Sequence, residues 1–191
     1  MQEPALAKTA PRMQETPWKL RGGIVLNDGR AVIWRQACES DLDALYAMFT
    51  ALSDESLYMR YIGYHRPTKE EIRTILERED REEISLVAAP TGKESEIVAQ
   101  VRCIFMDPLT DAELAVVVRD DWQNQGLGTT LVETILRYAS RAGVERIVGV
   151  SGLSNDRAIH IFNKLGFSTC YRCYDTVKMT LTLADITESR T

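Results

Sequence analysis

The turn formed by residues 123–128 (QNQGLG) has residue types suited to holding a phosphate group. It follows an apolar, β-branched run at 114–119, which predicts a strand, and it precedes apolar residues at helical spacing over 131–139. A turn between a strand and a helix leaves the first helical amides free to donate, and glycines let an anion approach the main chain. Two glycines are also common in loops without a ligand, so the neighbouring residues must decide.

Two common phosphate loops are excluded by the residues that surround these glycines. A Walker loop needs Gly-Lys-Ser/Thr, whereas Gly128 is followed by Thr129 and Thr130. A dinucleotide-binding turn needs a third glycine at the position of Leu131 and an acidic residue after the next strand, where Ser151 stands. The pattern that remains is Q-x-x-G-x-G.

A second segment, residues 155–167 (NDRAIHIFNKLGF), predicts a short amphipathic helix with Asn155 as its N-cap. The two segments together resemble the GNAT superfamily of acyl-CoA-dependent N-acyltransferases. That family has the loop Q/R-x-x-G-x-G/A directly after a strand, followed by a helix of the form N-x-x-A-x-x-x-Y-x-K-x-G-F. The helix positions that match are Asn155, Ala158, Lys164, Gly166 and Phe167.

The resemblance covers about residues 30–183. It implies a mixed α/β fold of the GNAT type, with a central mixed, splayed sheet flanked by helices, and acetyl-CoA as the co-substrate. It also implies that turn amides bind the diphosphate, that a strand segment pairs with the pantetheine arm and that Asn155 contacts this arm, although Asn155 also suits a helix cap. The predicted cofactor-binding residues are Val116, Val117, Val118, Gln123, Asn124, Gln125, Gly126, Leu127, Gly128, Thr129 and Asn155.

Glu113 is the predicted catalytic residue. An amine is protonated at neutral pH and must lose a proton before it attacks a thioester, and a nearby carboxylate can accept that proton. Glu113 stands between Ala112 and Leu114, and apolar surroundings would raise the pKa of its carboxyl group toward neutrality. The resemblance to GNAT enzymes implies that the glutamate at this position of the strand is the general base. The alternative is a solvent-exposed glutamate at a strand end.

Residues 26–64 resemble the segment that precedes the acetyl-CoA core in Pat-type bacterial protein lysine acetyltransferases. That segment has an Asp-Gly hairpin, an arginine-bearing strand and the pattern S-x-E-S-x-Y-x-R-F/Y. The resemblance implies a protein lysine as the acceptor, in a partner such as an acyl-CoA synthetase, with a small amine or amino acid as the alternative. Arg60 and its tyrosines would line the acceptor groove, or merely pack as a cation–π arrangement. The matching positions are Ser53, Glu55, Ser56, Tyr58, Arg60 and Tyr61.

Phe162 stands where many GNAT enzymes have a tyrosine that protonates the departing CoA thiolate. Phenylalanine has no proton to give, so we assign no general acid; water suffices, because a thiolate is a tolerable leaving group. Phe162 leaves a second hypothesis open, a non-catalytic acyl-CoA-binding sensor. The carboxylate of Glu113 favours an enzyme, an N-acetyltransferase, because a pure binding module has no use for it.

Local patterns predict the elements that position these residues. Asp28-Gly29 predicts a β-hairpin, Ser40 and Asp41 are expected to cap a helix that ends at Leu52, and Thr68 opens a capping box. The predicted strands are 24–26, 31–37, 84–89, 97–105, 114–119, 146–150, 167–174 and 177–183, and the predicted helices are 41–52, 56–64, 68–80, 129–141 and 155–167.

Composition predicts one globular domain. The 191 residues are 45% apolar and 27% charged, enough for a single sizeable core. Residues 1–19 contain three prolines and little periodic apolar content, so we expect a flexible N-terminal tail, a domain at 20–184 and a C-terminal tail at 185–191.

The remaining features exclude several classes of function. The cysteines have apolar neighbours, which predicts reduced, buried thiols, and Cys170-x-x-Cys173 lacks the second pair that a zinc site needs. The net charge of −5 argues against nucleic-acid binding. No apolar run approaches the roughly 20 residues of a membrane span and no signal peptide is evident, so we expect a cytoplasmic protein without membrane contact.

Overall fold

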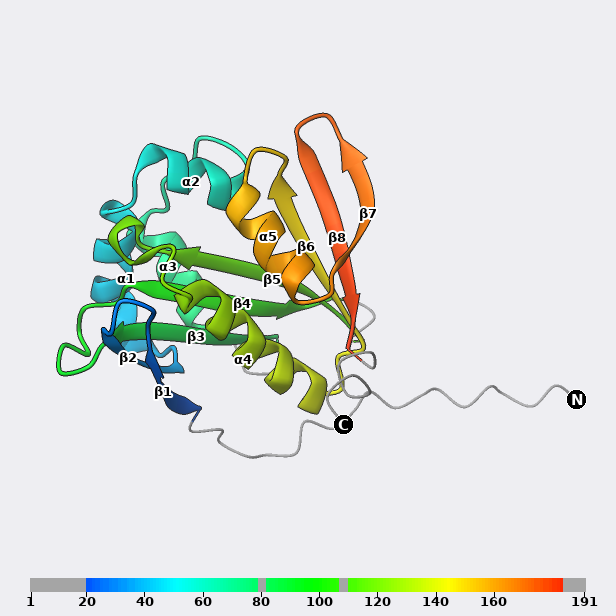
Figure 1. Cartoon of the computed structure of the whole chain (residues 1–191). Helices are drawn as coiled ribbons and strands as arrows, with labels where there is room; N and C mark the ends of the chain where they lie inside the picture. Colours follow the sequence, from blue (N-terminus) through cyan, green and yellow to red (C-terminus); the bar gives the residue numbers. More distant parts are fainter. Residues whose placement is uncertain (1–19, 79–81, 107–109, 184–191) are drawn as a thin grey trace, which may run out of the picture.

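The structure, a computed structural model, describes residues 20–78, 82–106 and 110–183, and within them the strands form one sheet with the order β1-β2-β3-β4-β5-β6-β8-β7 (Figure 1). Only the β5–β6 pair is parallel among these strands, so the sheet is mixed, as predicted. The strands are β1 (Arg21–Val25), β2 (Ala31–Gln36), β3 (Glu83–Pro90), β4 (Ala99–Phe105), β5 (Asp111–Val118), β6 (Arg146–Gly152), β7 (Ser168–Cys173) and β8 (Thr176–Thr182).

Helices cover both faces of the sheet. The apolar residues of α4 and α5 join the core on one face, and those of α1, α2 and α3 form a second cluster on the other face (Figure 1). The helices are α1 (Leu42–Thr50), α2 (Asp54–Tyr61), α3 (Lys69–Leu76), α4 (Leu127–Arg141) and α5 (Asp156–Lys164), with 3-10 turns η1 (Glu39–Asp41) and η2 (Asp120–Trp122).

The predicted hairpin and capping box are confirmed. Leu26 N–H donates to Arg30 O at 2.9 Å across the β1–β2 turn, where Gly29 has a φ of 86°. Thr68 accepts from the Glu71 N–H at 3.2 Å, and the Glu71 carboxylate accepts from the Thr68 N–H at 2.7 Å. These bonds satisfy backbone donors that the first turn of α3 would otherwise leave unpaired.

Asp41 is the N-cap residue of α1, as predicted, but neither Ser40 nor Asp41 makes a side-chain capping bond to this helix among the described residues. The Asp41 carboxylate pairs with Arg35 through two bonds of 2.6 and 2.7 Å and accepts from Cys38 N–H at 2.9 Å, so it is not available to α1. Ser53 lies in the break between α1 and α2 and also caps α2, because its hydroxyl accepts from the Ser56 N–H at 3.2 Å. A serine is the residue type that favours both roles.

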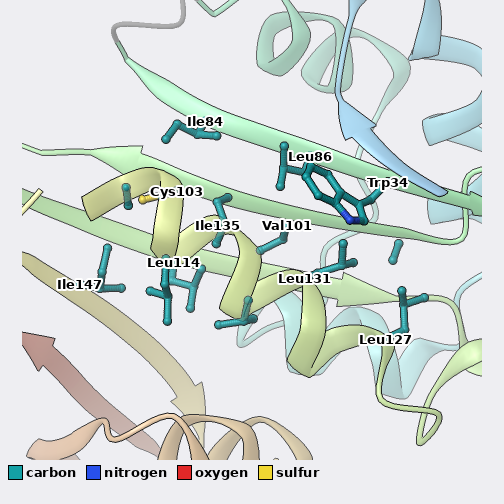
Figure 2. Close-up of a cluster of buried hydrophobic side chains, with 14 of the residues drawn as sticks. Trp34, Ile84, Leu86, Val101, Cys103, Leu114, Leu127, Leu131, Ile135 and Ile147 are labelled. Atoms are coloured by element: carbon teal, nitrogen blue, oxygen red, sulfur yellow. The ribbon is translucent and has the colours of Figure 1, made fainter. Parts of the chain in front are cut away.

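The core between α4 and the sheet fixes the start of that helix. Leu127, Leu131 and Ile135 point from α4 toward Leu86, Val101 and the other apolar side chains of the central strands (Figure 2). Truncating such a buried side chain to alanine typically costs about 2–5 kcal/mol. The first turn of α4 is therefore held firmly against the sheet.

The expectation of four buried thiols is wrong for two of them. Cys103 is fully buried in β4, whereas Cys38 and Cys170 are exposed and Cys173 is half-buried. Cys170 lies on β7, which is an edge strand that no described helix covers, so apolar neighbours in the sequence do not bury it.

Within the described residues, no group of three or more His, Cys, Asp or Glu residues could hold a metal ion. No helix among the same residues is long and apolar enough to cross a membrane. The predicted tails at 1–19 and 185–191 lie outside the described residues.

Candidate active site

Strands β5 and β6 run parallel and then part. Their pairing extends from Asp111 opposite Arg146 to Leu114 opposite Gly149, although both strands continue beyond these residues. Residues 115–118 of β5 and 150–152 of β6 do not pair with each other, and we call these two segments the splay. Figure 1 shows the two strands diverging from their paired ends. The main chain on this side of β5 is consequently available to a ligand.

Backbone direction decides which valines can use the splay. Arg119 N–H donates to Val98 O, on the β4 side, at 2.8 Å. The backbone groups of successive strand residues point to alternate sides, so those of Val117, two residues earlier, also point toward β4. Val116 and Val118 then direct their backbone groups toward the splay. The Val118 carbonyl already accepts from Gln123 Nε2 at 2.9 Å. Of the three predicted valines, only Val116 and Val118 can pair through the main chain with an added strand.

The turn after β5 presents a row of free amides. Gly126 has a φ of 85° and Asn124 a φ of 60°, which turns the chain so that α4 begins at Leu127. Among the described residues, no acceptor is bonded to the backbone N–H groups of 124–129. The Gln123 N–H differs, because it donates to Asp120 O at 3.3 Å. Such a row at a helix N-terminus is suited to an anion.

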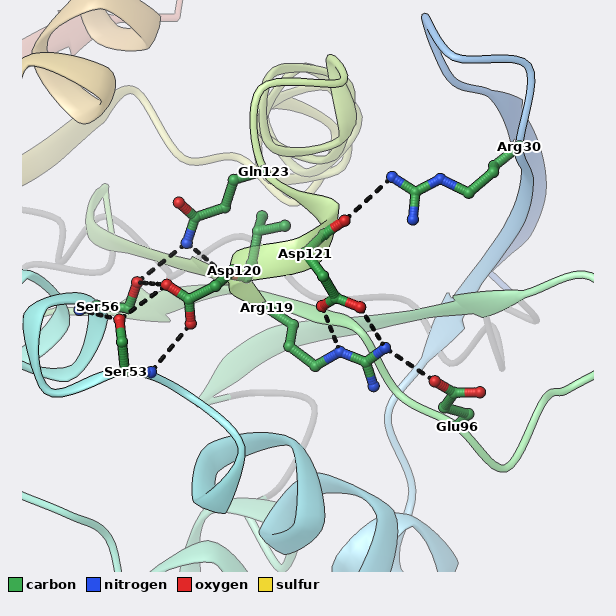
Figure 3. Close-up of polar contacts among 9 residues, drawn as sticks. Arg30, Ser53, Ser56, Glu96, Arg119, Asp120, Asp121 and Gln123 are labelled. Atoms are coloured by element: carbon green, nitrogen blue, oxygen red, sulfur yellow. Dashed lines mark hydrogen bonds and ion pairs between the residues drawn. The ribbon is translucent and has the colours of Figure 1, made fainter.

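A polar network ties α2 to this turn (Figure 3). The Asp120 carboxylate accepts from Ser53 N–H at 3.0 Å and from the hydroxyls of Ser53 and Ser56 at 2.8 and 2.7 Å. Gln123 Nε2 donates to the Ser56 hydroxyl at 3.0 Å. Burial by itself would raise the pKa of Asp120, but these hydrogen bonds hold it below its ordinary value. Sequence reasoning missed Asp120, because its partners lie far away in the chain.

The β1–β2 turn supports the other side of the same segment. Asn27 N–H donates to Gln125 O at 3.2 Å, and Arg30 donates to Asp121 O at 3.2 Å while its guanidinium carbon lies 3.8 Å from the centre of the Trp122 ring. Figure 3 shows Arg30 reaching toward Asp121. The turn with the free amides is thus braced by both α2 and the hairpin.

Glu113 lies on β5, one residue before the last β5–β6 pair, and its side chain is exposed. The predicted apolar surroundings are wrong. Successive side chains of a strand point to opposite faces, so Ala112 and Leu114 enter the α4 core while Glu113 faces the side of α1, α2 and α3. The carboxylate therefore lies open beside the splay.

The geometry agrees with a comparison with known protein families. The model of the acetyltransferase (GNAT) family matches residues 45–167. The chain belongs to this family. It is therefore an acetyltransferase that uses acetyl-CoA, and the expected family membership is confirmed.

Solved structures with the GNAT fold resemble this acetyltransferase over most of its length. The GNAT domain of PAT from S. lividans superposes with a TM-score of 0.80 at 24% identity, over 88% of this chain and 99% of that one. The acetyltransferase yncA from Salmonella typhimurium, solved with acetyl-CoA, gives 0.66 at 18% identity, over 78% and 92%. Spermidine N-acetyltransferase from Vibrio cholerae, solved with CoA and spermine, gives 0.66 at 15% identity, over 80% and 96%. These likenesses confirm the predicted GNAT fold.

In this acetyltransferase, Asn155 and Phe162 have structural roles. Asn155 Oδ1 accepts from the Ala158 N–H at 3.1 Å, so it is the N-cap of α5. Phe162 is 3% exposed, its ring stacks on Phe167 at 4.8 Å, and a Cβ added to Gly149 would lie 2.7 Å from its Cζ. The position of the usual tyrosine is thus filled by an aromatic core residue that covers the end of the β5–β6 pairing.

Proposed function

We propose that this acetyltransferase transfers the acetyl group of acetyl-CoA to the ε-amino group of a protein lysine, with Glu113 as general base. The proposal rests mainly on the position of Glu113. The exposed Glu113 carboxylate lies on the strand that leads into the free amides, immediately before β5 and β6 part. The free amides at one end of this open strand edge suit the diphosphate of an acyl-CoA, and the carboxylate at the other end suits an attacking amine.

We assign the cofactor contacts from the unpaired backbone. The amides of residues 124–129 would bind the diphosphate, with the Thr129 hydroxyl as a further donor, and Val116 and Val118 would pair with the pantetheine arm. Gln123 would act by shaping the turn, since its N–H and its amide group are already bonded. Asn155 retains its Nδ2 for the arm, because only its Oδ1 is engaged by the cap.

The chemistry then needs one proton acceptor. Glu113, directly or through a water molecule, takes a proton from the lysine ammonium, and the neutral amine attacks the thioester carbonyl. A C–N bond forms, the C–S bond breaks, and CoA leaves as a thiolate that takes a proton from water. Phe162 cannot supply this proton. Glu113 finally releases its proton to solvent, which its exposure permits.

The acceptor is inferred from the residue pattern of α2 and from the similarity to the PAT domain. A protein substrate such as an acyl-CoA synthetase fits that similarity, and the proposal includes a cytoplasmic location, where acetyl-CoA is supplied. A small amine is the second candidate, because the fold is shared with a spermidine N-acetyltransferase. The alternative of a binding module without turnover is set aside, because the chain belongs to a family of acetyltransferases.

Glu113→Gln tests the assignment. We expect kcat in a thiol-release assay to fall by about 100-fold or more, while the Kd of acetyl-CoA, measured by calorimetry, stays within a few-fold. Glu145→Gln, at another exposed glutamate, is the matched control and should keep full activity. Turnover of Glu113→Gln close to that of the wild type would refute the base.

The acceptor class follows from the same assay. Lysine-bearing proteins, including acyl-CoA synthetases, are compared with polyamines and free amino acids at equal amine concentration. We expect release of CoA with the proteins. A preference for polyamines would support the small-amine alternative, and no release with any acceptor would contradict the proposed function.

A further inference from the structure

Arg60 is a half-buried cation that contacts no counterion among the residues the structure describes. It lies on α2, its Nε is buried and has no hydrogen-bond partner, and its guanidinium carbon is 5.1 Å from the centre of the Tyr61 ring. Within the described residues it makes no ion pair. A guanidinium stays protonated at neutral pH, and a buried charge without a partner is costly. The tyrosine ring offsets only part of this cost.

The nearest carboxylates do not satisfy Arg60. Glu83 and Glu113 attract it, and Arg102 repels it. Glu83 is already held by Arg102 through a pair of hydrogen bonds, with Nε to Oε1 at 3.0 Å, and both of these side chains are at least 94% buried. Arg78 adds a contact to Glu83 at 3.5 Å. Glu113 is exposed and forms no ion pair with any residue that the structure describes, so this cluster lacks one negative charge next to Arg60.

Burial is the main influence on Arg60. Desolvation lowers the pKa of its guanidinium from the ordinary value of 12.5, and the neighbouring acidic groups only partly counter this effect. The lowered pKa is what a cation without a bound anion should show, because a paired carboxylate would raise it.

The helix that carries Arg60 lies across the splay. It packs on both β5 and β6, and the Met59 Sδ lies 4.0 Å from the position that a Cβ of Gly152 would occupy. Glu113 faces the same side of the sheet as this helix. The free guanidinium is thus placed beside the general base that we propose, where an acyl group and an acceptor meet.

We propose that Arg60 binds a carboxylate group carried by a substrate. The inference rests on the proposed function, since it concerns the acceptor side of the same site. A planar guanidinium and a carboxylate can form two parallel hydrogen bonds, and the carboxylate would supply the missing charge. It can belong to the acceptor, as an acidic residue beside the target lysine, or to the acyl chain of a dicarboxylic acyl-CoA.

Matched ligand pairs distinguish the two sources. In the acyl arm, calorimetry compares succinyl-CoA with butyryl-CoA. In the acceptor arm, calorimetry in the presence of CoA compares two lysine peptides that differ only in having Asp or Asn beside the lysine. Each pair is measured with the full chain, with Arg60→Met and Arg60→Lys, and with Arg172→Met as control, because Arg172 is exposed on the edge strand β7.

We expect the wild type to prefer the carboxylate member of one pair on the order of tenfold or more. Arg60→Met should lose this preference, Arg60→Lys should keep part of it, and Arg172→Met should keep all of it. The proposal is wrong if the wild type shows no preference in either pair, or if Arg60→Met retains it.

The test of Arg60 depends neither on the folding of one variant nor on turnover. If circular dichroism shows that Arg60→Met does not fold, Arg60→Lys provides the test, because lysine keeps the positive charge but lacks the planar guanidinium. An undiminished preference of Arg60→Lys for the carboxylate ligand would then contradict the proposal. Both arms measure binding alone. Absence of turnover with every acceptor would therefore refute the proposed function without affecting the test of Arg60.

Discussion

The hydroxyl of Ser56 donates a hydrogen bond of 2.7 Å to Oδ1 of Asp120, across 64 positions of the chain. It joins the first turn of α2 to the segment between β5 and the free amides of the turn. Because Ser56 also accepts from Gln123, the helix that carries Arg60 and the turn proposed to bind the diphosphate are held as one unit. A change at this junction should affect both sides of the site.

Asp120→Asn should weaken the junction. An asparagine keeps one acceptor oxygen where three donors now converge, so we expect a loss of about 1 kcal/mol, limited by the solvent exposure of this side chain, and a higher KM for acetyl-CoA. Urea denaturation and steady-state kinetics measure these effects. Asp175→Asn, in the exposed β7–β8 turn, is the control, and equal losses for the two variants would contradict a specific role.

The same carboxylate makes a prediction about acid stability. The pKa of Asp120 is lower in the folded protein than its ordinary value of 3.8. Its contribution to stability is therefore complete above that value and is lost as the pH falls through the folded-state pKa. Denaturation midpoints measured between neutral pH and about pH 3 should fall less steeply for Asp120→Asn than for the wild type. Identical slopes would argue against the shift.

Gly126 and Gly128 should respond differently to alanine. Gly126 has a φ of 85°, so an alanine there should cost about 1–2 kcal/mol. At Gly128 the added Cβ would meet Ile161 and Val118 at 3.5 Å, an ordinary contact, and alanine favours the helix, so thermal stability should stay equal or rise. Gly128→Ala should nevertheless weaken acetyl-CoA binding, because the added Cβ is bonded to the residue whose free amide we propose as a diphosphate donor. Unchanged binding by calorimetry would remove Gly128 from the diphosphate site.

Gly149→Ala should strain the contact between β6 and α5. A Cβ there would lie 2.7 Å from Phe162 Cζ, so the ring must move, at a cost of about 1–3 kcal/mol. Phe162→Leu removes the clash, and the double variant should lose less stability than the sum of the two single variants. Thermal or urea unfolding of all three proteins measures this coupling. Strict additivity would show that the two residues do not interact.

Thiol labelling should follow tertiary exposure. Burial raises the pKa of Cys103 to about 12, so this thiol should remain unmodified by maleimide at pH 7 until the protein unfolds. Cys38 and Cys170 are exposed and should react within the first minutes. Mass spectrometry of digested protein, with and without urea, locates the modified residues. Early labelling of Cys103 in the native protein would contradict the burial.

Much of the fold could be predicted because its signals are local. The Asp28-Gly29 turn, the capping box of Thr68 with Glu71, the Asn155 cap and the apolar period of α4 each depend on residues a few positions apart. The free amides after β5 follow in the same way from a strand, a glycine turn and a helix in succession. Family membership followed from these same segments.

The errors came from treating sequence neighbours as spatial neighbours. Glu113 was expected among apolar side chains, but alternation along β5 sends Ala112 and Leu114 to the opposite face. Asp41 was expected to cap α1 and is its N-cap residue, but Arg35 on a preceding strand takes its carboxylate. Cys170 was expected inside, but its strand lies at an edge of the sheet.

The sequence by itself determined the order of elements, the glycine turn that we propose binds the diphosphate, and the identity of the proposed base. Only the tertiary structure decided which valines face the splay, that Ser53 and Ser56 converge on Asp120, and that Arg60 has a buried Nε and no counterion among the described residues. The reason is physical. Backbone patterns are set by contacts within one or two turns of chain, whereas burial, strand direction and charge balance arise from segments tens of residues apart that meet only when the sheet forms.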